Sequence, residues 1–150
     1  MDPTEHESGY VVNVDVAVVR DGEYLCIERG ADEGHASGAL SFPGGKVEVE
    51  PDTADPIEAT AVREVREEVG VEVTNVQYVC SQSFVGDAGT PCLNVVTRAD
   101  HAGGEPHRAA PAEVAAVHWL TPDEVRAHDA APDYLVDYLD RVAASLAESV

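Results

Sequence analysis

Basic residues are scarce in this sequence, and lysine is nearly absent. The 150 residues hold 9 lysines and arginines against 29 aspartates and glutamates, which leaves a formal net charge of −20, and Lys46 is the one lysine. Nucleic acids and anionic membrane surfaces carry charge of the same sign and would repel such a chain. The composition therefore argues against nucleic acid and membrane as partners.

Long apolar runs and paired cysteines are also missing. No stretch approaches the roughly 18 consecutive apolar residues that a membrane-spanning helix needs. Cys26, Cys80 and Cys92 lie far apart in the sequence and form no CxxC pair, so neither a disulfide framework nor a zinc site is indicated. The histidines show no metal-ligand spacing either. Unpaired thiols fit a reducing compartment, and we expect a cytoplasmic protein.

Apolar residues are plentiful enough for one core. They make up 44% of the 150 residues, which suits a single globular domain. Residues 1–9 are polar and acidic, and we expect them to form a flexible N-terminal tail. No repeat and no second domain is visible in the remainder. The sequence therefore predicts one domain over residues 10–150.

Alternating apolar residues predict strands early in this domain. Tyr10 to Val19 alternates with the strand period of two, and Asp21-Gly22 is a hairpin signal that leads into a return strand over Tyr24 to Glu28. Leu40 to Phe42 forms a short strand that ends at Pro43-Gly44-Gly45, a predicted tight turn. Further strands are predicted over residues 71–84 with a break at 74–75, over 92–98 and over 114–120, with loops at 30–38, 85–91 and 100–112.

The first helix is defined by its end signals. Asp55 suits the N-cap, Pro56 the first helical position, Glu58 the third position of a capping box, and Gly70 the position after the last turn. The helix therefore spans residues 56–69. The residues of this helix that are expected to face the core of the protein are Ala59, Val62, Val65 and Val69.

Two more helices follow the last predicted strand. Thr121 caps one of them, and the other begins near Pro132. The core-facing residues of the last helix are expected to be Leu135, Tyr138 or Leu139, Val142 and Leu146. Strands interleaved with a few helices favour an α/β (α+β) fold in which helices cover a mixed central sheet.

The end of the first helix carries acids where stability alone would not place them. Glu64, Glu67 and Glu68 stand at i, i+3 and i+4 and share one stripe, close to the negative end of the helix dipole. The like-charged pair Glu64 and Glu68 costs roughly 0.2–0.5 kcal/mol. One interpretation is an exposed acidic face that Arg63 and Arg66 neutralise. The alternative is a functional site, because such sites break local rules.

The residues upstream favour the functional interpretation. The bare backbone of Pro43-Gly44-Gly45 can approach a ligand closely, and Lys46 follows it. Clustered carboxylates are the hard oxygen ligands that Mg²⁺ and Mn²⁺ share with substrate phosphates. Together these features predict a divalent-metal site that binds phosphate.

This arrangement resembles the Nudix box, GX5EX7REUXEEXGU, in which U is aliphatic. The second half of the box matches at every specified position, namely Arg63, Glu64, Val65, Glu67, Glu68, Gly70 and Val71. The first half departs from it: after Gly45 and five intervening residues the chain has Pro51, and Asp55 stands where the first glutamate is usual. We interpret this as a four-residue insertion around residues 50–54, which we expect to be a surface loop.

The resemblance to Nudix hydrolases implies a fold, a reaction and a set of residues. The fold is an α/β/α sandwich, and the reaction is Mg²⁺- or Mn²⁺-dependent hydrolysis of a nucleoside diphosphate linked to a moiety X. The implied metal ligands are Glu64, Glu67, Glu68 and the carbonyl of Gly44, and Glu48 is a further, weaker candidate for contact with the metal shell. Arg63 is expected to orient a box glutamate. Lys46 either binds phosphate or is a surface lysine. The general base is a box glutamate or an acid from a distant loop, for which Glu113 is the candidate here, with an exposed charge as the alternative role of Glu113.

The substrate and the assembly stay open at this stage. An oxidised nucleoside triphosphate and a nucleotide such as ADP-ribose are both compatible with the resemblance, and relatives often form homodimers. An isomerase on the same scaffold is disfavoured by the short chain. A catalytically silent nucleotide-sensing module is a further alternative, and it predicts the loss of box glutamates that are all present here.

The excess of acid with so little lysine resembles the composition of proteins from halophilic cells. We expect the melting temperature to rise steeply when KCl is raised from about 0.1 M to about 1 M, because the Debye length falls from about 10 Å to about 3 Å and screens the self-repulsion. Thermal unfolding followed by circular dichroism at the two salt concentrations measures this. A flat response would instead indicate an ordinary acidic protein.

Overall fold

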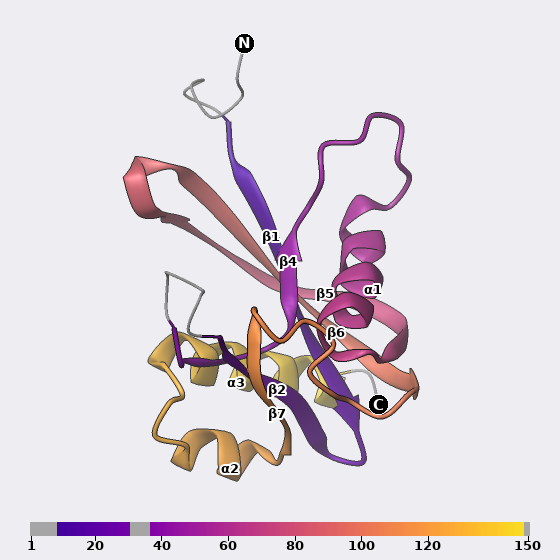
Figure 1. Ribbon diagram of the computed structural model, residues 1–150, viewed down its shortest axis with the longest axis vertical. Helices are drawn as coiled ribbons and strands as arrows, with labels where there is room; N and C mark the ends of the chain where they lie inside the picture. The colour runs from indigo at the N-terminus through magenta and orange to yellow at the C-terminus, as the bar shows by residue number, and fades with distance from the viewer. Residues whose placement is uncertain (1–8, 31–36, 149–150) are drawn as a thin grey trace.

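A seven-stranded mixed sheet forms the centre of the molecule (Figure 1). The computed structural model describes residues 9–30 and 37–148, so most of the expected tail and part of the loop expected at 30–38 lie outside the described residues. The strands are β1 (Val11–Arg20), β2 (Glu23–Arg29), β3 (Leu40–Ser41), β4 (Gly44–Lys46), β5 (Glu72–Val85), β6 (Pro91–Gly103) and β7 (Val114–Leu120). The order β3-β2-β1-β6-β5 forms its main path.

Strand β1 pairs with two different strands along one of its edges, and the sheet forks there. It runs parallel to β6 from Val11 to Val19, whereas its other edge is shared by two shorter partners. Near its end β1 pairs with β2 through the Asp21-Gly22 hairpin, and near its start it pairs with β4, where Val14 lies opposite Gly45. The edge of β2 that faces away from β1 pairs with β7, and β3 pairs with Ile27 and Glu28 on the same edge as β1. The sheet therefore forks between β2 and β4.

Helices cover both faces of this sheet, as the sequence predicted for a mixed α/β fold. Helix α1 (Pro56–Val69) packs on one face, and α3 (Asp133–Glu148), with α2 (Pro122–Ala127) beside it, lies on the other (Figure 1). The alternation of β1 separates two cores, because Val14, Val16 and Val18 join the core under α1 while Ala17 joins the core under α3. Cys26 and Cys80 are buried in the second core.

Helix α1 has the predicted bounds, but two details of the prediction were wrong. Asp55 has a left-handed backbone (φ 49°) and makes no side-chain capping bond, because the chain enters the helix from an exposed loop and only the Asp55 carbonyl accepts a hydrogen bond, from Ala59. Ala59 is exposed rather than buried. The buried stripe runs instead through Thr60, Ala61, Val65, Glu68 and Val69.

The region predicted as a tight turn at Pro43-Gly44-Gly45 is a strand. Residues 44–46 pair with residues 13–15 of β1, a partner 29 or more residues away in the chain that local turn signals do not reveal. Strand β6 is also longer than predicted and continues to Gly103, into the loop expected at 100–112. The break expected at 74–75 is a bulge in β5, where Asn75 has φ 55°.

The last two helices match their predicted starts and core faces. Thr121 accepts a hydrogen bond from the Glu124 backbone and its own N–H donates to the Glu124 side chain, which completes a capping box. The buried residues of α3 are Leu135, Tyr138, Leu139 and Val142, with Leu146 packed beside them. Among the described residues, no helix is both long and apolar enough to cross a membrane.

The two caps provide a matched test of the fold. We expect Thr121→Ala to lower the free energy of unfolding by about 1 kcal/mol, because it removes a side-chain capping bond. Asp55→Gly removes no such bond and relaxes a left-handed backbone, so it should cost nothing or stabilise by up to about 1 kcal/mol. Urea unfolding at fixed high salt measures both. Equal destabilisation by the two substitutions would contradict this description of the caps.

Candidate active site

A pocket of about 360 Å³ opens at the fork of the sheet. Its walls come from the start of β1, the ends of β2 and β4, helix α1 and the residue before β7. The lining residues are Asn13, Ile27, Arg29, Gly44, Gly45, Lys46, Glu48, Glu64, Glu68 and Glu113. The structure thus brings most of the predicted site residues together from segments that are distant in sequence.

Glu68 connects α1 to the sheet. The backbone N–H of Gly44 donates to its carboxylate over 2.8 Å, and only 7% of the residue is exposed. The stripe prediction placed Glu68 on an acidic face, whereas its carboxylate lies on the buried side of the helix, one turn from Val65. A buried carboxylate that is held by a backbone N–H is fixed in place, as a binding group requires.

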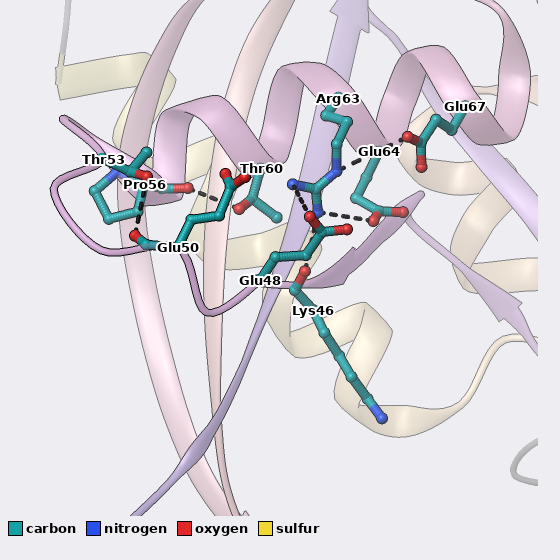
Figure 2. Close-up of polar contacts among 9 residues, drawn as sticks. All are labelled: Lys46, Glu48, Glu50, Thr53, Pro56, Thr60, Arg63, Glu64 and Glu67. Carbon is teal, nitrogen blue, oxygen red and sulfur yellow. Dashed lines mark hydrogen bonds and ion pairs between the residues drawn. The ribbon is translucent and has the colours of Figure 1, made fainter.

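Glu64 is held by Arg63, which also contacts β4. The Arg63 guanidinium donates to Glu64 over 3.1 Å and to the Lys46 carbonyl over 3.1 Å (Figure 2). It also lies 3.8 Å from the Glu48 carboxylate. Arg63 therefore joins three segments of the pocket wall and leaves one side of the Glu64 carboxylate for other partners.

Glycine at position 45 leaves room for the Glu64 carboxylate in this arrangement. A Cβ atom built there would overlap the Glu64 carboxylate, whose Oε1 would lie at 2.7 Å. Gly45 lies opposite Val14 of β1, on the face of the sheet that α1 covers. The missing side chain thus lets α1 bring Glu64 against the backbone of β4.

Lys46 points elsewhere. Its ammonium group extends away from Arg63 and Glu64 in Figure 2, while its carbonyl faces them. Because β4 alternates, Lys46 shares the sheet face of Asn13, its register partner in β1. Lys46 still lines the pocket, at the end away from α1.

Glu113 and Glu67 have contrasting positions. Glu113 lies just before β7, where its carbonyl accepts a hydrogen bond from the Gly30 backbone, and its side chain lines the pocket. The Glu67 side chain is 60% exposed and lies outside the lining, 4.0 Å from Arg63. In the described part of the chain, no three acidic, histidine or cysteine side chains are close enough together to hold a metal ion.

The pocket concentrates negative charge under partial burial. Desolvation raises the pKa of Glu68 to about 8, with the charges of Glu64 and Glu113 adding to the rise, and the Gly44 hydrogen bond and the charge of Arg29 opposing it. Desolvation also raises the pKa of Glu64, against the hydrogen bond and charge of Arg63. Neighbouring carboxylates with raised pKa values are typical of sites that bind a cation, because the cation stabilises their ionised forms.

Two polar lining residues, Arg29 and Asn13, were missed in the sequence, as was the apolar Ile27. Arg29 ends β2 and Asn13 belongs to the first half of β1, and neither lies in a motif. The distant pairing of β1 with β4, and the fork beside β2, bring them to the pocket. The only local signal was the presence of a cation at the end of a buried strand.

The outer parts of the motif lie at the helix ends. Asp55 precedes α1 and Gly70 follows it with φ 71°, where its N–H donates to the Arg66 carbonyl. The insertion at residues 50–54 is exposed and projects as a loop between β4 and α1 (Figure 1), as expected. It does not line the pocket.

Known proteins share both the sequence pattern and the fold. The model of the NUDIX domain matches residues 9–139. The CTP pyrophosphohydrolase of Escherichia coli (strain K12) is 42% identical over 72 residues, which are 47% of this chain and 50% of that protein. The match therefore spans about half the length of this curated relative.

Solved structures are similar over nearly the whole chain. A MutT NUDIX hydrolase from Burkholderia pseudomallei has a TM-score of 0.73 at 28% identity, over 88% of this chain and 97% of the other. The Escherichia coli ORF135 protein has a TM-score of 0.67 at 29% identity, over 90% and 89%. The chain belongs to the NUDIX hydrolase family, and its sheet and helices have the sandwich arrangement that the box implied.

Glu68 provides a test of the pocket's electrostatics in metal-free protein. Its folded pKa of about 8 exceeds the ordinary 4.5, so the folded state holds the extra proton between these values and its stability falls as pH rises through them. We expect Glu68→Gln to remove this loss, which amounts to at most about 1.4 kcal/mol per pH unit.

The measurement is urea unfolding of both proteins between about pH 5 and pH 8, in a chelator and at constant salt. Glu67→Gln, in which the altered side chain is 60% exposed, is the control for losing a carboxylate from the same helix end. Parallel pH profiles for wild type and Glu68→Gln would contradict the burial of this group.

Proposed function

We propose that the protein is a divalent-metal-dependent pyrophosphohydrolase that cleaves a nucleoside diphosphate linked to a moiety X. The observation that carries this is the gathering of Glu64, Glu68 and Glu113 in one pocket with the cations Arg29 and Lys46. The carboxylates of this pocket suit a divalent metal that bridges to the pyrophosphate, and its cations suit direct ion pairs with the phosphate oxygens.

The donor set fits Mg²⁺ or Mn²⁺. Both ions prefer carboxylate and carbonyl oxygens, and Glu64, Glu68 and the Gly44 carbonyl can provide them, with Glu67 completing the set by a change of side-chain rotamer. Because Gly45 has no Cβ atom, the Glu64 carboxylate can lie against the backbone of β4. When bound, the ion supplies positive charge that polarises phosphoryl oxygens and acidifies an attacking water.

The remaining residues have roles that follow from their contacts. Glu113 lines the same pocket as Glu64 and Glu68. We assign to it the role of general base, which accepts the proton of the attacking water. Arg63 positions Glu64 through its hydrogen bond and is itself held by the Lys46 carbonyl. Arg29 and the Lys46 ammonium neutralise the phosphates as charge builds up on the leaving group.

Nucleoside triphosphates are the first substrates to examine. The relative from Escherichia coli carries the name CTP pyrophosphohydrolase. This chain aligns with about half of the length of that protein. Oxidised deoxynucleoside triphosphates and ADP-ribose-like nucleotides fit the same pyrophosphate chemistry. A screen for phosphate and pyrophosphate release over these nucleotides, with Mg²⁺ or Mn²⁺ at high salt, separates them.

A silent nucleotide-sensing module is the alternative within the same family. It would have no need to keep every group that touches the metal or water. The chain keeps Glu64, Glu67 and Glu68, and it places Glu113 beside two of them. This conjunction favours an enzyme.

Glutamate substitutions test the catalytic assignment. We expect Glu68→Gln and Glu67→Gln each to lower metal-dependent kcat/KM by at least about 10- to 100-fold, because each removes a charged oxygen ligand, while the protein still folds. Glu58→Gln, on the exposed first turn of the same helix, should leave kcat/KM unchanged. Removal of metal by a chelator should abolish turnover reversibly. Full activity in both variants would refute the assignment.

A further inference from the structure

A second polar cluster adjoins the pocket, on the sheet face opposite α1. We call it the Asp15 cluster and define it as Asn13, Asp15, Asn94 and Tyr138. Asn13 donates to Asp15 over 3.1 Å and to Asn94 over 2.8 Å, and Asn94 donates to Asp15 over 3.0 Å and to the Tyr138 hydroxyl over 3.1 Å. The proposed hydrolysis uses none of these groups.

The Asp15 cluster and the glutamates are separated by one residue of β4. Gly44 donates its N–H to Glu68, and a Cβ atom on Gly44 would lie 3.0 Å from the Asp15 carboxylate. Asn13 belongs to both regions, because it bonds to Asp15 and also lines the pocket. The Asp15 cluster therefore lies next to the glutamates of the pocket, and Asn13 is the side chain that the two regions share.

Tyr134 supplies an aromatic surface beside this cluster. It is 48% exposed, and its ring centroid lies 5.9 Å from that of Tyr138. Desolvation raises the pKa of the Tyr134 phenol, and the nearby charge of Asp15 adds to the rise while that of Arg29 opposes it. The charge of Arg29, which lines the pocket, also acts on Glu68, so this cation is close to both regions.

Asp15 is costly as a purely structural residue. Desolvation raises its pKa, and the hydrogen bonds from Asn94 and Asn13 and the charge of Arg29 only oppose this. Apolar residues at such a position are often more stabilising than a buried charge. An ionised carboxylate accepts about four hydrogen bonds, and two of them are used here. As whole residues, Asp15 and Asn13 are partly buried rather than fully enclosed.

We propose that the Asp15 cluster reads the nucleobase of the substrate and selects bases that carry an exocyclic amino group over their keto counterparts. A carboxylate accepts but does not donate, so it bonds the amino group of cytosine or adenine and repels the keto oxygen of uracil or hypoxanthine. Tyr134 stacks on the base. The inference rests on the proposed function for the position of the phosphates.

Matched nucleotide pairs test this selection in the wild-type protein. CTP differs from UTP, and ATP from ITP, mainly by an amino group in place of a keto oxygen. We expect kcat/KM to favour the amino member of each pair by about tenfold or more. Equal kcat/KM values within either pair would overturn the proposal.

Substitution of Asp15 tests which residue reads the base. Asp15→Asn offers an N–H to a keto oxygen, so the amino-to-keto ratio of kcat/KM should fall at least about tenfold, mainly through KM. Asp137→Asn, an exposed site on α3, removes the same charge and should keep the ratio. An unchanged ratio in folded Asp15→Asn would refute the proposal.

Tyr134→Ala provides a second variant, at a site where half the side chain is already exposed. It should raise KM for all four nucleotides by about tenfold and leave both ratios unchanged, because stacking does not depend on the amino group. This variant tests the position of the base even if Asp15→Asn does not fold, and the matched nucleotide pairs on the wild-type protein then test the selection. Unaltered KM values would contradict the placement of the base.

Binding of CMP and UMP separates this proposal from the proposed function. Calorimetric titration without metal should show tighter binding of CMP by about tenfold or more, whether or not any triphosphate is hydrolysed. Inactive protein that still prefers CMP would refute the hydrolase assignment alone. Active protein that binds CMP and UMP equally would refute base selection alone.

Discussion

The hydrogen bond from the Gly44 N–H to Glu68 is the contact on which the candidate site depends. It joins the last turn of α1 to β4, and β4 is itself held by its pairing with β1. With Glu68 fixed, Glu64 lies one turn earlier on the same helix, against the bare Gly45. A carboxylate in this position is costly without a partner, and the backbone N–H provides one that cannot move away.

Charge balance in the pocket follows from this contact. Glu64, Glu68 and Glu113 face one another under partial burial, and the cations Arg29 and Lys46 line other parts of the same pocket. Burial raises the pKa of both Glu64 and Glu68, and the charge of Glu113 adds to each rise, so the arrangement favours the binding of positive charge. Arg63 balances only the outer side, where it reaches Glu64 and the Lys46 carbonyl.

Local chemistry allowed the helices and the glutamates to be predicted, and distant pairing accounts for the errors. Pro56 and Gly70 mark the ends of α1 because proline and glycine restrict or free the backbone wherever they occur. The strand at Gly44, by contrast, exists only because β1 lies beside it. For the same reason Arg29 and Asp15 were missed, since their neighbours come from other strands and from α3.

The exposed loop at residues 50–54 has a consequence for how such proteins are recognised. This loop is part of the exposed connection between β4 and α1. The glutamates are positioned by strand pairing and by the packing of α1 on the sheet, and not by the loop. The count of residues between the glycine and the helix is therefore free to drift in evolution. A search pattern with fixed spacing across this junction would overlook relatives whose three-dimensional arrangement is intact.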